Sequence, residues 1–262
     1  MRTEIARLDL GIRRRLMIGY LVGMALYTFI VVAMYPAFKD SESLNKLIQA
    51  DSTAAALFGV SGSITSVGGW LNGNIYANFL PLIMLLLTVG YGASSLAGQD
   101  EEGTLCLLAT LPIPRSRIVL QKIGAMGAQG AALAVVVGAF VLLGNSFGLA
   151  VSFGNVAAIS VSSLLLGLDF GLLAMAAGAA LGRRGAAIGA ASALAAASYL
   201  LSSLAPVVNT VKPGRYLSLF YWSIGNGQIT AGVSAVDYGV LAVVGVLLAA
   251  LVIILFRRAD LH

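Results

Sequence analysis

The residues whose types and spacing could mediate a specific interaction lie in one polar stretch, residues 98–122, which reads GQDEEGTLCLLATLPIPRSRIVLQK. Acids come first, leucines follow, Pro112 and Pro114 interrupt, and bases come last. Carboxylates are favoured in the first turn of a helix, where free amides carry partial positive charge. Proline ends a helix because it lacks an amide donor. The pattern predicts a short amphipathic helix in a loop, offered to a soluble partner protein.

The sequence offers little for covalent chemistry. Cys106 is the single cysteine and the single histidine, His262, is the last residue. We therefore expect neither a disulfide framework nor a metal site. No Gly-x-x-x-x-Gly-Lys-Ser/Thr phosphate loop occurs, so any ATP hydrolysis must belong to another chain. A membrane hydrolase would need a nucleophile with a base, a metal or paired carboxylates. We expect no catalytic residue and no cofactor in this chain.

The composition is that of an integral membrane protein. Of the 262 residues, 59% are hydrophobic and 10% are charged, whereas soluble domains contain about a quarter charged residues. The formal charge of +5 is a topology signal, because bases of membrane proteins gather on the cytoplasmic side. Binding to nucleic acid is therefore not expected, and the lipid bilayer is the predicted surrounding.

Apolar runs long enough to cross a bilayer, which takes about 20 residues, predict an all-α membrane domain over residues 1–262. The six runs lie at about 16–38, 75–97, 123–143, 156–181, 186–205 and 238–256. With the N-terminus inside, 12 of the 16 bases fall in the cytoplasm and 4 outside. Both chain termini are then predicted to be cytoplasmic.

Two segments outside the spans have their own patterns. Ile5, Leu8 and Ile12 recur at helical spacing among charged residues, which predicts an interfacial helix along the membrane, or a simple topogenic anchor. Residues 207–237 are too long for a turn and too apolar for a free loop. One or two short helices dipping into the outer leaflet are expected there, or an aromatic belt with a surface loop.

Asp169 is the single charge within the predicted spans. A carboxylate at membrane depth costs on the order of 3 kcal/mol and usually faces the bundle interior or water. It could line a substrate path. Alternatively, it forms a structural hydrogen bond with Ser192, Ser198 or Tyr199 on a neighbouring helix.

Small residues four apart let helices approach closely in lipid. They are expected to pack within one subunit, or along a dimer seam. The pairs are Gly19 and Gly23, Gly167 and Gly171, Gly178 and Gly182, and Gly185 and Gly189.

The stretch 98–122 resembles the loop between the second and third spans of ABC-2-type ABC exporter permeases. The likeness extends to the end of the first span, the hairpin between the fourth and fifth spans, and the segment before the last span. These stretches are Tyr35-Pro36-x-Phe38-x-Asp40-Ser41, Gly182-Arg183-Arg184-Gly185, and Arg215-Tyr216-Leu217-Ser218 with Phe220-Tyr221-Trp222. Gln99, Glu102 and Cys106 depart from the residues more usual in that family.

In that family the short helix is a coupling helix that seats on a separate ATP-binding subunit, which holds ATP and magnesium. The resemblance implies ATPase contacts at Asp100, Glu101, Glu102, Gly103, Thr104, Leu105 and Leu108. It also implies a connector helix before the first span, with Arg7, Arg13 and Arg14 near the ATPase. A second permease subunit, identical or paralogous, would complete the assembly.

The implied function is that of the permease of an ATP-driven exporter in a bacterial or archaeal cytoplasmic membrane. It would move a hydrophobic or amphipathic substrate, such as a drug, antibiotic, peptide or lipid, by alternating access. Two alternatives stay open at this point: an ion-coupled secondary transporter using Asp169, and a non-transporting membrane scaffold.

Overall fold

The computed structural model describes residues 4–39, 65–104, 114–206, 208, 212–225 and 228–258. The regular structure of these residues is entirely helical, and six of their helices are long and apolar enough to cross a membrane. The predicted all-α fold with six spans is thereby confirmed.

The second span is built from consecutive helical pieces without a break. They are α4 (Val67–Leu71), the π-helix η1 (Asn72–Phe79), α5 (Leu80–Ala93), the π-helix η2 (Ser94–Gly98) and α6 (Gln99–Glu101). Pro81 lies at the point where η1 passes into α5, inside this continuous helix, and it donates no backbone hydrogen bond there. The wider π winding directly before it takes up the irregularity that a proline introduces.

The other elements follow in chain order. The remaining spans are α1 (Glu4–Phe38), α8 (Arg115–Leu143), α9 (Phe153–Leu181), α10 (Arg184–Leu204) and α13 (Ala235–Arg258). The short helices are η3 (Gly144–Phe147), η4 (Lys212–Leu217), α11 (Leu219–Ile224) and α12 (Gln228–Ala231). The last three occupy the segment where short helices were expected before the final span.

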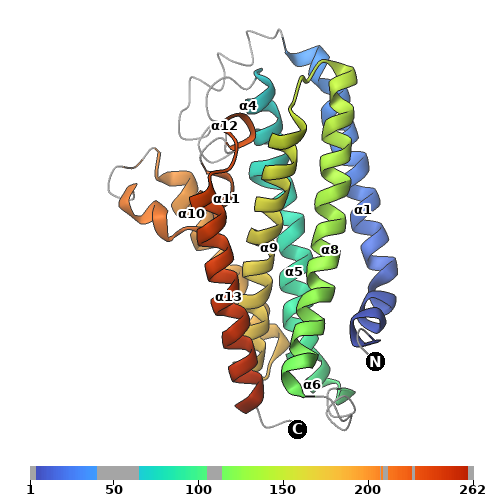
Figure 1. The fold of residues 1–262 in the computed structure, drawn as a ribbon, viewed down its shortest axis with the longest axis vertical. Coiled ribbons are helices and arrows are strands. Elements are labelled where there is room, and N and C mark those ends of the chain that lie inside the picture. Colours follow the sequence, from blue (N-terminus) through green and yellow to red (C-terminus); the bar gives the residue numbers. More distant parts are fainter. Residues whose placement is uncertain are drawn as a thin grey trace.

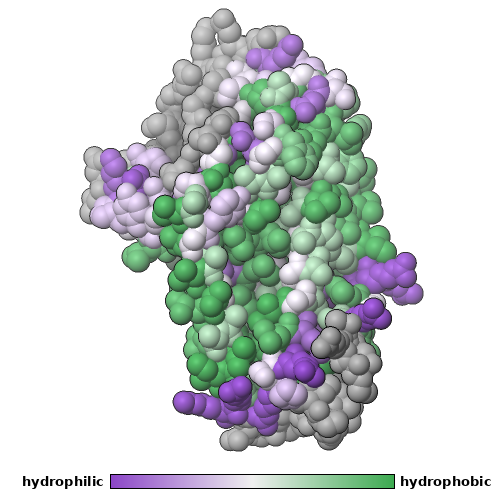
Figure 2. Space-filling model, viewed as in Figure 1, coloured by the Kyte–Doolittle hydropathy of each residue, from purple (hydrophilic) through white to green (hydrophobic). Residues whose placement is uncertain are grey.

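Helix α9 is the centre of the bundle and packs against α5, α8, α10 and α13, while α1 packs on α8 at the outside (Figure 1). Helix α1 begins and α13 ends at the same end of the bundle, the lower end in Figure 1. We call this the basal end. The end of α6 and the start of α8, which flank the polar loop, lie there as well. Figure 2 shows hydrophobic side chains over the middle of the visible face and hydrophilic ones gathered toward the ends.

The N-terminal amphipathic segment is not a separate helix, because α1 runs unbroken from Glu4 to Phe38. Its predicted apolar stripe is split. Ile5 is buried, whereas Leu8 and Ile12 are 60% and 73% exposed. Asp9, which the sequence placed on a polar outer face, is only 5% exposed. The face of α1 that meets the bundle therefore carries Ile5 and Asp9, one helical turn apart.

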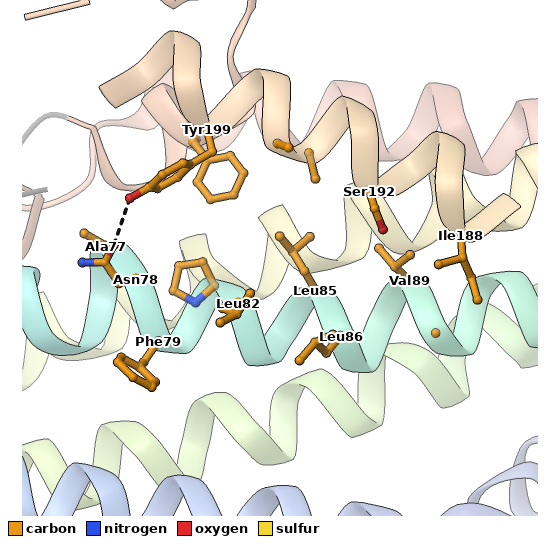
Figure 3. A pocket seen from close by; sticks show the side chains of 15 residues that line it. Ala77, Asn78, Phe79, Leu82, Leu85, Leu86, Val89, Ile188, Ser192 and Tyr199 are labelled. Carbon is orange, nitrogen blue, oxygen red and sulfur yellow. Dashed lines mark hydrogen bonds between the residues drawn. The ribbon is translucent and has the colours of Figure 1, made fainter. Parts of the chain in front are cut away.

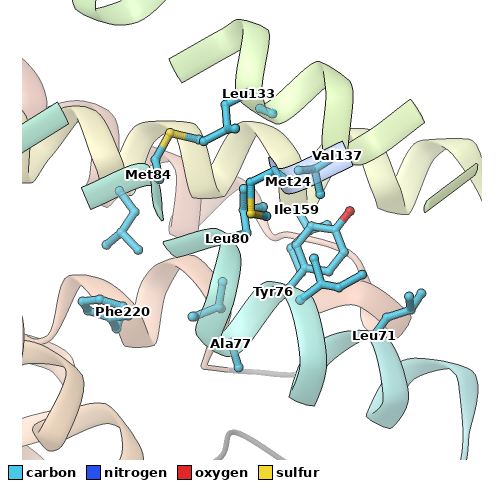
Figure 4. Close-up of a cluster of buried hydrophobic side chains, with 14 of the residues drawn as sticks. Met24, Leu71, Tyr76, Ala77, Leu80, Met84, Leu133, Val137, Ile159 and Phe220 are labelled. Carbon is cyan, nitrogen blue, oxygen red and sulfur yellow. The ribbon is translucent and has the colours of Figure 1, made fainter. Parts of the chain in front are cut away.

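The apolar core lies where α5, α8 and α9 meet (Figure 4). Met84 of α5 occupies space that a side chain at Gly167 would need. At Gly92 of α5, an added Cβ would clash with the backbone carbonyl oxygen of Gly171 in α9. The predicted close packing at Gly167 and Gly171 is confirmed. It joins α5 to α9 nearly backbone to backbone.

The other glycine pairs behave differently. A Cβ on Gly178 would contact Ala97 at 3.2 Å, and Gly182 ends α9 with a φ of +63°. The pair Gly19 and Gly23 has no heavy atom within 4 Å of an added Cβ, and the same is true of the pair Gly185 and Gly189. These last two pairs do not mediate packing among the described residues of one chain.

We expect Gly92→Ala to weaken the joint between α5 and α9. The added methyl group meets a backbone atom that cannot rotate away, so the free energy of unfolding should fall by about 1–3 kcal/mol. Thermal unfolding of the protein in detergent should then occur roughly 2–10 °C lower. Gly23→Ala is the matched control and should leave the midpoint unchanged. Equal midpoints for the two variants would contradict the assigned contact.

Candidate functional site

The polar loop begins at the end of the second-span helix. Asp100 and Glu101 lie in the last turn of that helix, and not in the first turn of a following one as the sequence suggested. Gly103 then takes the left-handed region with φ +69°, and its amide donates to the carbonyl of Asp100 at 2.9 Å. Glycine is favoured there because a Cβ would be strained. Thr104 is helical again. The predicted contacts Leu105 and Leu108 lie outside the described residues.

Glu101 reaches across to another helix. Its Oε1 accepts a hydrogen bond of 3.0 Å from the backbone amide of Arg184, the first residue of α10. A carboxylate at a helix N-terminus satisfies a free amide and complements the helix dipole. The side chain of Arg184 lies alongside, because a Cβ on Gly98 would be 3.3 Å from its Cδ. The loop and the predicted basic hairpin thus meet directly.

A buried charged residue fixes α8, the helix that follows the loop, to its neighbours. Lys122 of α8 is fully buried, and its Nζ donates to Gln99 Oε1 at 2.7 Å and lies 3.5 Å from Asp9 Oδ2. The hydroxyl of Tyr91 donates to the same Asp9 oxygen at 2.7 Å. This network, which we call the Lys122 cluster, joins α1, α5, α6 and α8. A charge buried in this way must be paired to be tolerated.

The predicted connector arginines divide between the cluster and solvent. The guanidinium of Arg13 lies 4.8 Å from the ring centroid of Tyr91, a cation–π contact. Arg7 and Arg14 are exposed. The amide of Ile5 donates to Gln121 Oε1 at 3.1 Å, a second link from α1 to α8. The start of α1 is therefore fixed to the loop exit by polar contacts on one face.

Arg115 ties the loop exit to the last span. Its Nη1 donates to the carbonyls of Phe256 and Arg257 at 3.2 and 3.3 Å, at the C-terminus of α13. Its guanidinium also lies 5.9 Å from the ring centroid of Phe256. A base at a helix C-terminus satisfies free carbonyls and complements the dipole. Together with Glu101 and Lys122, this contact connects both ends of the loop to three other spans, α1, α10 and α13.

An apolar groove opens between α5 and α10 (Figure 3). It encloses about 570 Å³ and is lined mostly by apolar side chains, with Leu82 and Leu86 on one wall. Ser192 and Ala196 lie on the α10 wall and are exposed, so the groove is open on one side. Tyr199 donates to Asn78 Oδ1 at 2.9 Å and closes the groove at one end. The groove suits an apolar ligand with few polar groups.

The segment before the last span packs on α10 beside this groove. Ser218 Oγ donates to the Ser198 carbonyl at 2.6 Å, and Phe220 of α11 is one of the residues that line the groove. Arg215 lies over the rings of Tyr216 and Tyr221, at 4.8 and 5.0 Å from their centroids. Its hydrogen bond to the Tyr216 hydroxyl raises the pKa of Arg215, so the guanidinium stays charged.

Asp169 is buried on α9 but does not line the groove. It faces α13, where a Cβ on Gly245 would be 2.8 Å from Asp169 Oδ1. Its Oδ2 has no hydrogen-bond partner among the described residues. Of the partners considered from sequence, Ser198 bonds to α11 and Tyr199 to Asn78. The structure therefore brings Asp169 to none of the other candidate residues.

Sequence reasoning missed Asp9, Tyr91 and Lys122 as a unit. Lys122 lies at the boundary of a predicted span and was counted only as a topology signal. Asp9 lies four residues after Ile5, so the two share a helix face. The four-residue spacing of Ile5 and Asp9 could have indicated that Asp9 faces the bundle. It was overlooked because Ile5 was grouped with Leu8 and Ile12 as one apolar stripe.

The residues present hold no metal site that geometry supports. Within the described ranges, no group of three histidines, cysteines, aspartates or glutamates comes together. The arrangement offers polar joints and an apolar groove, and so it is suited to binding and movement.

Six spans, four of them packed against the central helix α9, define a polytopic membrane protein whose polar loop is bonded to neighbouring helices at both of its ends. A scan against models of protein families matches residues 3–261 to the ABC-2 family transporter proteins. The chain belongs to that family. A search of curated proteins finds no match.

Lys122→Met should destabilise the protein because it leaves the Asp9 carboxylate buried without its cation. The expected loss is about 3–5 kcal/mol in the free energy of unfolding, measured by thermal unfolding in detergent. The double variant Asp9→Leu with Lys122→Met removes both charges and should be more stable than Lys122→Met alone. Additive losses in the double variant would show that the two side chains do not interact.

Proposed function

We propose that this chain is the membrane permease subunit of an ATP-driven exporter. The observation that carries the proposal is the connection between the polar loop and the groove: Glu101 at the loop caps α10, and α10 is one wall of the groove. A partner that moves the loop can therefore change the shape of a ligand site in the bundle. Family membership supports the same assignment.

The proposed partner is a separate ABC ATP-binding subunit, which supplies ATP and magnesium. We assign its contact to the loop, through Asp100, Glu102, Gly103 and Thr104 together with Leu105 and Leu108. Arg7 and Arg14 of α1 are exposed at the same end and suit the edge of this contact. The chain itself then acts as a non-catalytic subunit.

The proposed orientation places the basal end in the cytoplasm of a bacterial or archaeal cell. Arg115 and Arg184 are the first residues of α8 and α10, and Arg257 lies in the last turn of α13, all on that side. Bases favour the cytoplasmic side of a membrane, so both termini are cytoplasmic.

Transport follows from linked equilibria. A second permease, identical or paralogous, faces the open side of the groove and completes the path. ATP shifts the spans only as far as the two conformations differ in affinity for the nucleotide-bound partner. The apolar walls favour a hydrophobic or amphipathic substrate. Export by alternating access is the resulting mechanism.

Replacing Leu105 and Leu108 together with Asp should abolish binding of the ATPase subunit. Charge on the apolar face of the helix predicted there from sequence would have to be desolvated at the contact, which costs several kcal/mol. The measurement is affinity purification from the native membrane in mild detergent, with identification of the proteins that accompany the permease. Leu217→Asp, an equally drastic change at the other end of the bundle, is the control. Wild-type chain that brings down no ABC ATPase in several detergents would overturn the proposed function.

Filling the groove should separate ATP hydrolysis from transport. Ala196→Phe places a ring in the groove, whereas the neighbouring Ala197 is exposed on α10 and is not among the groove residues. In proteoliposomes containing the complex, with the dye Hoechst 33342 as the probe, Ala196→Phe should reduce dye movement about tenfold for a cost near 1.4 kcal/mol. Ala197→Phe should retain it. If both variants moved the dye equally, the groove would not be the path.

A further inference from the structure

Both walls of the groove are fixed at one point of the basal end. The α5 wall continues through η2 into α6, so it reaches Glu101 along the chain itself. The α10 wall begins at Arg184, whose amide is bonded to the Glu101 carboxylate at 3.0 Å. The bond between Glu101 and the Arg184 amide therefore joins the two walls at the basal end, whereas the bond between Tyr199 and Asn78 joins them at the other end.

The sequence explains why α10 needs a cap from elsewhere. Its N-cap residue is Arg183, which makes no side-chain capping bond. The hairpin Gly182-Arg183-Arg184-Gly185 contains no Ser, Thr, Asp or Asn, the usual N-cap residues. Four amides at the start of a helix lack partners within it. Glu101 supplies a partner for one of them.

The charge of Glu101 favours the same contact. At the end of its own helix a carboxylate is unfavourable, because the C-terminus of a helix carries partial negative charge. At the N-terminus of α10 the same carboxylate is favourable. The bond to Arg184 thus places Glu101 where its charge complements a helix dipole.

We propose that Glu101 is a positioning residue that latches the two walls of the groove together at the basal end by capping α10. A loop movement that withdraws the carboxylate releases the first turn of α10 and opens the groove toward the basal side. This assigns Glu101 a role within the permease, in place of a contact made only with the ATPase. The role of this latch in transport rests on the proposed function.

The bond can be removed separately from either partner. Glu101→Ala removes the acceptor, while Glu101→Gln keeps an acceptor oxygen and loses the charge. Arg184→Pro removes the amide hydrogen at the first helical position, where proline is well tolerated. Arg183 has φ −130° and ψ 119°, a conformation compatible with a following proline. Arg184→Ala is the matched control because it loses the side chain and keeps the amide.

The readout is the accessibility of the groove from the basal side. A cysteine replaces Ser192 on the α10 wall in a Cys106→Ser background, and a polar maleimide is applied to inside-out membrane vesicles without ATP. Loss of the cap, worth about 1 kcal/mol, should speed labelling about fivefold. We expect this for Glu101→Ala and Arg184→Pro. Arg184→Ala should label at a rate close to that of the parent protein. Glu101→Gln should label at a rate between those of the parent protein and Glu101→Ala, because it keeps the acceptor and loses the charge.

The inference is overturned if Arg184→Pro labels at the same rate as Arg184→Ala. The amide hydrogen bond to Glu101 would then have no effect on the accessibility of the groove. It is also overturned if Glu101→Gln labels as fast as Glu101→Ala. Labelling uses the permease in its membrane and needs no ATPase activity. If no ABC ATPase accompanied the wild-type chain, only the proposed function would be overturned. The labelling comparison would still decide whether Glu101 holds the two walls together.

Discussion

The buried ammonium of Lys122 is the constraint on which the basal end depends. It is compensated by Asp9 from the first helix and Gln99 from the end of the second span, while Tyr91 occupies the same Asp9 oxygen. A buried ion pair contributes little net stability compared with apolar residues of the same volume. It does restrict which positions can face each other. Asp9 has to meet Lys122, and this fixes the register of α1 against α8.

Helix termini organise the rest of this end. Glu101 lies at the N-terminus of α10 and Arg115 at the C-terminus of α13, so each charge complements the helix that it contacts. Both residues belong to the edges of the same loop. The loop thus reaches the first, fifth and sixth spans through three polar contacts, and it is continuous with the second and third. The loop is therefore connected to five of the six spans, either by these contacts or along the chain.

The spans could be predicted from sequence because lipid forces every backbone amide to be paired within its own helix, and apolar length then suffices. The glycine contacts at Gly167 and Gly171 followed from the same logic. The partner of Asp9 could not be predicted. Lys122 is 113 residues away, and hydropathy does not distinguish an apolar face that is left exposed, such as Leu8 and Ile12, from one that meets protein.

The candidate site was found in part for a related reason. The sequence located the loop and its acids, since a polar island between apolar tracts is visible without a structure. It placed those acids in the first turn of a new helix, because acids before leucines are typical of a helix start. The helix of the second span continues further than hydropathy indicates and ends only at Glu101. The helix start that Glu101 serves belongs to α10, a neighbour in space only.

The two walls of the groove differ in how closely they pack against the rest of the bundle. Helix α5 meets α9 at Gly92 and Gly171, where no side chain intervenes and a shift would bring backbones into collision. Helix α10 is less embedded than the second span. Of the residues in its most apolar stretch 17% are buried, against 61% for the second span. A Cβ added at Gly185 or Gly189, in its first two turns, would meet no heavy atom within 4 Å. Helix α10 therefore packs less closely than α5 does, and its basal end is held by the bond between Glu101 and the Arg184 amide.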